Sequence, residues 1–378
     1  MSAIPPGFMR VLARRDRADG DEANRLIERS SEQRAGLLSE RELGTRDGTR
    51  DGTRDGTRAE IRAELRNCAR AVARVGQVLV RPTHALLTPL EREVARGLGA
   101  EVNGTRILGH AFTGVVEDAA HAAGIPPRGT RVVVQPVFSC GICARCQGGL
   151  AMHCASRSIA GLDAAAGGLA EIVAVPAANC VPIPKDLDDE RAVFAAPLAR
   201  AIEAVRRGGV EKRTFASVLG DDLSAVLAAL VAVEENPLAR LVAMHEATLR
   251  AAEQFGVRHR ALHEIGRRGD QELVIDTTGS AETLAAAARM VQPRGHVVVA
   301  GISARAPVAF DLSHIALDEI EVHGSGFGPI AAAVDRLARR TIDPSPLISR
   351  RIGFAEAAKA LASLGEPGVF SVLVQISR

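Results

Sequence analysis

The 378-residue sequence contains no tryptophan, no tyrosine and only three lysines among its 47 basic residues. Without tyrosine, no phenol can act as the general acid in carbonyl reduction of the short-chain or aldo-keto type. None of the lysines, Lys185, Lys212 and Lys359, lies in a Gly-Lys-Ser/Thr motif, which excludes a P-loop for nucleotide phosphates. These absences remove two styles of carbonyl reduction and one way of binding a nucleotide.

Aromatic residues and unbalanced charge are also scarce. Phenylalanine supplies all ten aromatic residues, too few for a surface that binds single-stranded nucleic acid by stacking. The formal net charge of +2 gives no strong field toward DNA or a membrane. The longest apolar run, residues 225–233, is far shorter than a membrane span, and residues 1–16 lack the apolar stretch of a signal peptide. We therefore expect a cytoplasmic protein that binds neither nucleic acid nor membrane.

Four of the six cysteines fall within residues 140–154 with the spacing C-x2-C-x2-C-x7-C. In a reducing compartment, such clustering indicates metal binding rather than disulfides. Four thiolates close a tetrahedral zinc site and leave no position open for substrate. An iron–sulfur cluster also uses four cysteines, but the spacing differs from the ferredoxin patterns. We predict one structural zinc per chain, held by Cys140, Cys143, Cys146 and Cys154.

Residues 14–60 are highly charged and repeat the tetrad GTRD three times from Gly44. Such a repeat has no apolar face to bury, which predicts a flexible excursion from the fold. Its arginines and aspartates cancel in charge, which disfavours a docking arm. The flanking residues 22–43 and 59–75 are predicted to be helical, the second because three apolar residues fit one helical stripe, namely Ile61, Leu65 and Val72.

Short β-like runs and alternating strands and helices divide the rest of the chain. The runs at 77–81, 105–116, 131–137 and 169–175 are separated by glycine and proline and predict a compact β region. After Pro197 the βαβα alternation predicts a doubly wound parallel sheet. The expected divisions are a first strand at 9–13 with the charged insertion (1–75), the β domain (76–196), the α/β domain (197–326) and a C-terminal segment (327–378).

Several motifs resemble those of the zinc-dependent alcohol dehydrogenases, in the medium-chain dehydrogenase/reductase family. Residues 109–116, GHAFTGVV, are similar to the family's G-H-E-x-x-G-x-V segment. The cysteine lobe and the segments 76–81, 129–132, 168–171, 276–279 and 293–301 are similar to other family motifs. The resemblance covers about residues 70–378. It implies a GroES-like β domain completed by the C-terminal segment, an inserted Rossmann domain, and a homodimer formed through the Rossmann edge strand, near His296 to Ala300.

The resemblance also implies a catalytic zinc, but the expected ligands are largely missing. Counted from Gly76, the family's ligand cysteine falls on Thr88, while the histidine is present as His110. The glutamate after that histidine is Ala111, the third ligand is Ala196, and the proton-relay hydroxyl is Leu90. One imidazole cannot hold zinc where three protein ligands are needed. His110 is then a hydrogen-bonded remnant or a general acid, unless His84 or Glu91 turns toward it and rebuilds a metal site.

The expected dinucleotide loop is altered as well. In residues 218–225, Gly220 holds the first glycine position, Asp222 the second and Ala225 the third. Asp222 places a carboxylate where the pyrophosphate would lie at a helix N-terminus. Two like charges about 4 Å apart cost about 4 kcal/mol at an effective dielectric constant of 20. As an N-cap, however, the same aspartate favours the helix, and we prefer this interpretation.

The end of the second Rossmann strand does not identify the cofactor. This position offers an acidic residue to the ribose of NAD or a basic residue to the phosphate of NADP. Glu246 lies one residue late for the ribose, and His245 or Arg250 is available for a phosphate. The sequence therefore leaves NAD, NADP or neither open.

Three functional hypotheses follow. The first is an NAD(P)-dependent oxidoreductase that acts on a small alcohol or carbonyl without catalytic zinc. The second, which we favour, is an alcohol-dehydrogenase-like protein that keeps the structural zinc, while its degraded catalytic site and glycine loop leave it impaired or inactive. The third is a zinc-loaded dehydrogenase with substitute ligands.

Overall fold

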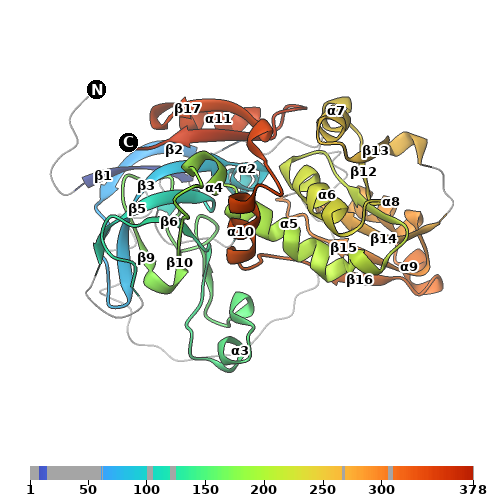
Figure 1. Ribbon diagram of the computed structural model, residues 1–378, viewed down its shortest axis with the longest axis horizontal. Coiled ribbons are helices and arrows are strands. Elements are labelled where there is room, and N and C mark those ends of the chain that lie inside the picture. Colours follow the sequence, from blue (N-terminus) through green and yellow to red (C-terminus); the bar gives the residue numbers. More distant parts are fainter. Residues whose placement is uncertain are drawn as a thin grey trace, which may run out of the picture.

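The computed structural model describes residues 8–14, 61, 63–99, 105–119, 125–265, 269–304 and 310–377. These residues form a β-rich lobe and an α/β lobe that lie side by side (Figure 1). The helix expected at 22–43 and the GTRD repeat lie outside the described residues. No helix in the described part of the chain has both the length and the apolar character needed to cross a membrane.

A seven-stranded sheet forms the β-rich lobe, with the order β10-β6-β5-β3-β18-β17 and β9 also paired to β3. Its last strand in the sequence, β18, runs antiparallel to β3, so the C-terminal segment completes this lobe. Alternate residues of β3 are buried in the core between the sheet and α11. The strands are β3 (Gln77–Leu87), β5 (Phe112–Ala119), β6 (Arg131–Val134), β9 (Val173–Pro176), β10 (Cys180–Pro182), β17 (Ile348–Gly353) and β18 (Ser371–Gln375).

A second, three-stranded sheet of the β-rich lobe corrects one prediction. It has the order β2-β1-β4, formed by β1 (Phe8–Arg14), β2 (Ala63–Ala69) and β4 (Arg106–Ile107). Residues 63–69 are therefore a strand, although 59–75 was expected to be a helix. The side chains that pack on the core are spaced by two, as in a strand, whereas Val72 is 79% exposed. Those core-facing side chains are Ile61, Ala63 and Leu65.

Six parallel strands form the sheet of the α/β lobe, in the order β13-β12-β11-β14-β15-β16. Numbered within the lobe, this order is 3-2-1-4-5-6, the arrangement of a dinucleotide-binding Rossmann sheet. All four residues of β11 are buried, as expected for a parallel strand covered on both faces. The strands are β11 (Ala216–Leu219), β12 (Arg240–Ala243), β13 (Arg258–Ala261), β14 (Gln271–Asp276), β15 (Val291–Val299) and β16 (Glu321–Gly324). The edge is thus β16, one strand beyond His296.

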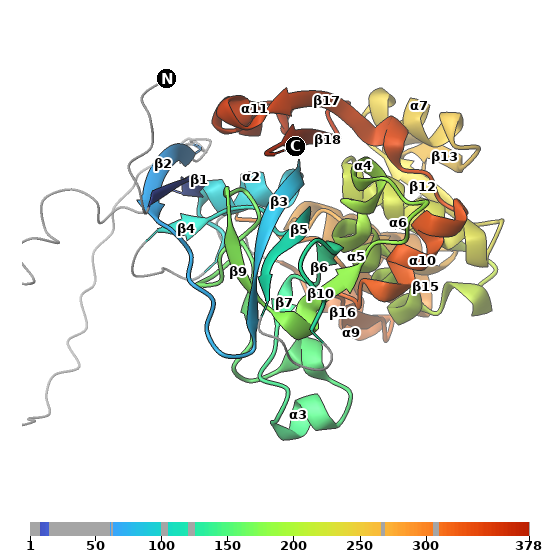
Figure 2. The ribbon, with the colours of Figure 1, turned by 60° about the vertical axis from the view of Figure 1, so that its left-hand side comes forward.

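Helices cover both faces of the Rossmann sheet and connect the lobes (Figure 1). Those of the α/β lobe are α5 (Ala195–Gly208), α6 (Leu223–Glu235), α7 (Glu246–Gln254), α8 (Ala281–Met290), α9 (Ser313–Leu317) and α10 (Ala331–Arg339). The β-rich lobe carries α2 (Pro89–Arg96), α4 (Asp189–Ala192) and α11 (Ala357–Ser363). A separate loop bears α3 (Ala144–Gln147) and extends away from the body of the molecule (Figure 2), near the two-stranded sheet of β7 (Val137–Phe138) and β8 (Ser158–Ile159).

Candidate functional site

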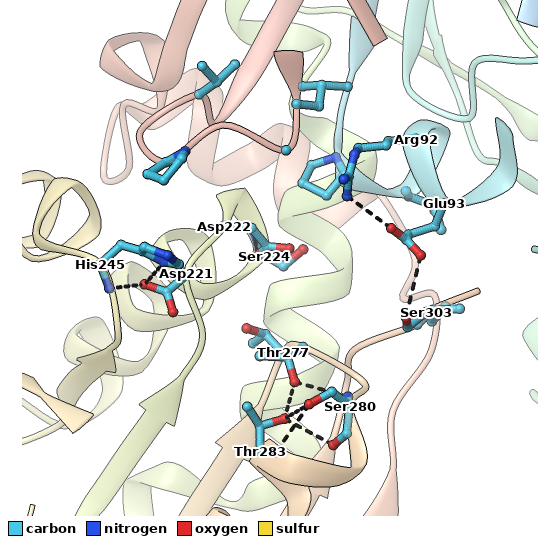
Figure 3. Close-up of a pocket in the computed structure, with 18 of the residues that line it drawn as sticks. Arg92, Glu93, Asp221, Asp222, Ser224, His245, Thr277, Ser280, Thr283 and Ser303 are labelled. Atoms are coloured by element: carbon cyan, nitrogen blue, oxygen red, sulfur yellow. Dashed lines mark hydrogen bonds and ion pairs between the residues drawn. The ribbon is translucent and has the colours of Figure 1, made fainter. Parts of the chain in front are cut away.

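A cavity of about 370 Å³ lies between the two lobes. Its floor is the carboxyl end of the Rossmann strands, where the sheet order reverses at β11 between β12 and β14, the place where such sheets bind ligands. Helix α2 and residues 364–367 of the β-rich lobe form the opposite wall (Figure 3). The lining carries five carboxylates and three guanidinium groups, namely Glu93, Asp221, Asp222, Glu282 and Glu366 with Arg92, Arg96 and Arg200.

His110 lies just before β5 and forms an almost fully buried pair with Glu91 of α2. The side chains are 1% and 2% exposed. Glu91 Oε1 accepts a hydrogen bond from the backbone N–H of His110 at 3.0 Å and also contacts its Nδ1. His84, the other residue considered as a partner, faces Asp189 instead, with Nδ1 3.8 Å from Oδ2. Of the two candidate partners of His110, the structure brings Glu91 to it and not His84.

Thr88 and Glu91 form a capping box that holds this carboxylate in place. Thr88 is the N-cap of α2, and its hydroxyl accepts from the Leu90 N–H at 3.2 Å. Glu91 Oε2 accepts from the Thr88 N–H at 3.0 Å and from its hydroxyl at 2.7 Å. Burial by itself raises the pKa of Glu91, but the charge of His110 and the hydrogen bonds from His110 and Thr88 outweigh it and lower the pKa. Glu91 is therefore an ionised, fully engaged carboxylate.

The positions expected for the zinc ligands and for the glutamate beside them do not supply a donor set. Ala111 and Ala196 lie in one hydrophobic core cluster, and the Thr88 hydroxyl is already bonded to Glu91. Among the described residues, His110 belongs to no group of three His, Cys, Asp or Glu donors close enough to share an ion. A catalytic zinc needs three protein ligands, so these residues do not fit one.

Arg200 of α5 lines the cavity and brings a cation near Asp222 and Glu91. Sequence reasoning missed this residue. Its guanidinium lies 5.3 Å from the ring centre of Phe327, and its Nη2 donates to the carbonyl of Ala300 at 3.1 Å. Burial lowers the pKa of Arg200, while Asp222 and Glu91 act in the opposite direction. The Phe327 ring also meets the edge of His110 at 6.2 Å. His110 Nε2 is buried and has no hydrogen-bond partner among the described residues.

The glycine loop joins β11 to α6, and its two aspartates have different partners. Asp222 is the N-cap of α6 and accepts from the N–H groups of Ser224 and Ala225 at 2.9 and 3.2 Å. Burial raises the pKa of Asp222 to about 6. Its carboxylate therefore occupies the N–H groups that a pyrophosphate would use at this helix end. Gly220 cannot be replaced without a clash, because a Cβ would come within 2.1 Å of Thr277 Oγ1.

Asp221 ties this loop to the end of β12. Its carboxylate accepts from the N–H groups of Met244, at 3.0 Å, and His245, at 2.7 Å. The His245 ring is 3.2 Å from the same carboxylate. Glu246, the residue considered for ribose binding, is exposed and pairs with Arg250 at 2.7 Å. The acidic group at the tip of β12 is thus Asp221, which comes from the preceding loop.

A row of hydroxyl groups lines the cavity beyond β14, and sequence reasoning did not assign it. Asp276 is fully buried and accepts from the N–H and hydroxyl of Thr278 at 2.9 and 2.8 Å. Thr277 donates to the Leu219 carbonyl at 3.0 Å. In the sequence, the DTTG motif at residues 276–279 was the one feature that pointed to these hydroxyl groups. The other hydroxyls of the row belong to Ser280 and Thr283 (Figure 3).

The four clustered cysteines come together in the loop around α3. Neighbouring sulfurs are 3.5–3.9 Å apart: Cys143–Cys146 3.5, Cys154–Cys140 3.5, Cys140–Cys146 3.9 and Cys143–Cys154 3.9 Å. Tetrahedral Zn–S bonds of about 2.3 Å separate sulfurs by about 3.8 Å. The group therefore fits a structural zinc with four thiolate ligands.

Backbone amides favour the thiolate form of two of the four cysteines. Hydrogen bonds from the N–H groups of Ile142 and Cys143 lower the pKa of Cys140, and the N–H of Cys146 chiefly lowers the pKa of Cys143 to about 6. Burial, with the neighbouring thiols, raises the pKa of Cys146 to about 11. Gly141 and Gly149 adopt φ of +72° and +78°, which lets the loop turn around the sulfurs. Thiolates are the form that binds zinc.

Two family models match the chain. Residues 74–185 match the alcohol dehydrogenase GroES-like domain, and residues 239–340 match the zinc-binding dehydrogenase domain. An uncharacterized zinc-type alcohol dehydrogenase-like protein of Haemophilus influenzae is 26% identical over 285 residues, which cover 72% of this chain and 82% of that protein. The starvation-sensing protein RspB of Escherichia coli is 26% identical over 302 residues, or 76% and 88% of the two chains.

Solved structures show the same fold. A protein of Sinorhizobium meliloti, assigned to the zinc-binding dehydrogenases and bound to NADP, is 26% identical and has a TM-score of 0.74, with coverage of 84% of this chain and 97% of that one. A thermostable alcohol dehydrogenase of Pyrobaculum aerophilum is 25% identical with a TM-score of 0.72, covering 83% and 96%.

Proposed function

Because this chain belongs to the zinc-type alcohol dehydrogenase-like proteins of the medium-chain dehydrogenase/reductase family, we propose that it keeps the family's scaffold and structural zinc but does not catalyse zinc-dependent alcohol oxidation. The observation that carries this proposal is the donor set around His110. Thr88 and Ala196 stand where the resemblance expects ligands, and Ala111 stands where it expects the nearby glutamate. Both carboxylate oxygens of Glu91 already accept hydrogen bonds, from His110 and Thr88. Without three free donors, zinc cannot be held with an open position for substrate.

The same proposal extends to weak dinucleotide binding. A pyrophosphate at the start of α6 would compete with the Asp222 carboxylate for the N–H groups of Ser224 and Ala225. At neutral pH that carboxylate is mostly ionised, because its raised pKa is about 6. This charge opposes an anionic cofactor.

Titration of the full-length protein with NADH and NADPH tests the proposal. We expect no saturation at micromolar concentrations and no alcohol oxidation when Zn²⁺ is added in excess. Micromolar binding accompanied by zinc-stimulated turnover would overturn it. Substitution of His110 by Ala serves as the control, since any activity from rebuilt metal ligation would depend on that imidazole.

A zinc-free NAD(P)-dependent reductase is the second candidate, supported by the cavity itself. The cavity lies at the switch point of a Rossmann sheet, and Arg200 supplies a cation there that would polarise a carbonyl oxygen of a small substrate. Oxidation of NADPH by a panel of small aldehydes and ketones tests this candidate. Activity that is retained with a chelator and lost in Arg200→Ala would favour it; failure of every substrate to consume NADPH would favour the first proposal.

A further inference from the structure

We propose a second metal site, formed by His296, Glu321 and His323 at the outer edge of the Rossmann sheet, which binds a divalent transition-metal ion such as Zn²⁺. The site lies on β15 and β16, outside the set of residues that line the cavity between the lobes. Among the described residues, these three and the four cysteines are the only groups of three or more His, Cys, Asp or Glu whose ligand atoms all converge.

Sheet register brings the three side chains together. His296 of β15 is the parallel partner of Glu321 on β16. His323 follows Glu321 by two residues, and side chains two apart in a strand lie on the same face of a sheet. The placement is therefore a property of the two adjacent strands and does not depend on a loop.

The spacing of the ligand atoms matches a tetrahedral ion. Glu321 Oε2 lies 3.5 Å from His296 Nδ1 and 3.3 Å from His323 Nε2. The two ring nitrogens are 3.4 Å apart. Zinc bonds of about 2.0–2.1 Å in tetrahedral geometry separate neighbouring ligand atoms by about 3.3–3.4 Å. The three atoms thus outline one face of a tetrahedron, and the fourth position is left for water or another ligand.

The chemistry of the donors agrees with this geometry. Two imidazoles and one carboxylate are ligands that suit Zn²⁺ and other late first-row ions. The two imidazole rings are nearly parallel, with centres 5.6 Å apart and an interplanar angle of 16°. The facing nitrogens and the carboxylate oxygen lie within 3.5 Å of one another, close enough for one ion to contact all three. In the single chain, the side chains are 18%, 60% and 32% exposed for His296, Glu321 and His323, which leaves a path for an ion.

Metal content of the full-length protein tests this site. After dialysis against Zn²⁺ and removal of loosely bound ion, we expect two zinc per chain in the native protein and one in His323→Ala and in His296→Ala. His314→Ala is the matched control, because His314 is also exposed and pairs with an acidic residue, Asp318, at 2.9 Å, with no third donor among the residues that the structure describes. It should retain two.

Cobalt substitution identifies the ligands of the second ion. Protein whose cysteine site is filled with zinc should take up Co²⁺ with a tetrahedral d–d spectrum that lacks a thiolate charge-transfer band, and His323→Ala should abolish that spectrum. A second equivalent lost in His110→Ala but kept in His323→Ala would overturn the proposal and place the ion in the cleft. No uptake beyond one zinc at a hundredfold excess of metal would also overturn it. Circular dichroism of the variants verifies that the fold is kept.

Discussion

Asp222 Oδ1 lies 3.2 Å from the backbone nitrogen of Ala225, so the first turn of α6 is closed by a side chain of its own chain. In a dinucleotide-binding loop this turn is left open for a phosphate. Here the Asp222 carboxylate, which stabilises the helix, and a bound anion would compete for the same N–H groups.

Removing the Asp222 charge should tighten dinucleotide binding. Repulsion between the carboxylate and a pyrophosphate is on the order of 4 kcal/mol at short range, and about 1.4 kcal/mol corresponds to a tenfold change. We expect Asp222→Asn to raise NADPH affinity at least about tenfold, and Asp222→Gly to raise it further because the Cβ is also removed. Fluorescence titration measures both. Unchanged affinity in both variants would show that cofactor does not approach this loop.

Affinity for NAD⁺ should depend on pH through the same residue. Burial raises the pKa of Asp222 to about 6, so the carboxyl gains a proton as pH falls from about 7.5 to about 5.5 and the repulsion weakens. Calorimetric titration should therefore show tighter NAD⁺ binding at the lower pH. The change should be absent in Asp222→Asn; a pH effect of equal size there would assign it to another group.

The same raised pKa fixes the sign of the stability change. A carboxyl whose pKa is higher in the folded state holds its proton more tightly there, so Asp222 destabilises the fold as pH rises through about 6. Relative to Asp222→Asn, the free energy of unfolding of the native protein should fall as pH rises from about 4 to about 6. Denaturant unfolding at each pH measures this change.

The Glu91–His110 pair should show strong coupling. Removing one partner of a buried hydrogen-bonded pair leaves the other unsatisfied, at a cost of about 1–3 kcal/mol. We therefore expect Glu91→Gln to lower the free energy of unfolding by about this amount, and the double variant Glu91→Gln/His110→Ala to lose less than the sum of the two single variants. Because the pKa of Glu91 is lowered, its contribution is present above its ordinary pKa and is lost as pH falls through the folded value. Additive effects in denaturant unfolding would contradict the coupling.

Gly220 should tolerate no side chain. A Cβ there would approach Thr277 Oγ1 to 2.1 Å, and overpacking of this kind costs about 1–3 kcal/mol. Gly220→Ala should lower the Tm, whereas Gly353→Ala, where a Cβ meets nothing within 4 Å, should leave it nearly unchanged. Equal melting temperatures for the two variants would refute the close approach.

The cysteine lobe should lose its zinc when one ligand is removed. In a His323→Ala background, Cys146→Ser should reduce the zinc content to nearly none and lower the Tm, because metal binding stabilises the folded loop. Cys68→Ser is the control, since Cys68 lies on β2, far along the chain from the lobe. Zinc retained by Cys146→Ser would mean that the four sulfurs do not form the site.

Local patterns predicted the α/β lobe well. Strands β11, β12, β14 and β15 contain short apolar runs, so most of the alternation from β11 to β15 follows from residues close in sequence. Strand β13 has the mostly exposed sequence RHRA, contains no such run and was not predicted. Cysteine spacing likewise placed four ligands that the structure brings together. In both cases the signal and the contact are local.

The sequence could not predict which distant segments of the chain pair with one another. Ile61 and Leu65 are four residues apart, which fits one face of a helix or one face of a strand, and only the ladder between β1 and β2 decides for the strand. Glu91 meets His110 because α2 packs beside the loop before β5. The register between β15 and β16 brings together His296, Glu321 and His323. This register is set by the tertiary structure and cannot be read from the local sequence.

Arg14 and Ala63 are partners at one end of the β1–β2 ladder, so the chain leaves the sheet and re-enters it at nearly the same point. Residues 15–62 connect these ends. The entropy of closing a connection grows only with the logarithm of its length, by about 0.6 kcal/mol for each doubling. The sheet therefore constrains the two ends of this connection but hardly its length. Changes in the length of this connection should leave the register of the β1–β2 ladder unchanged.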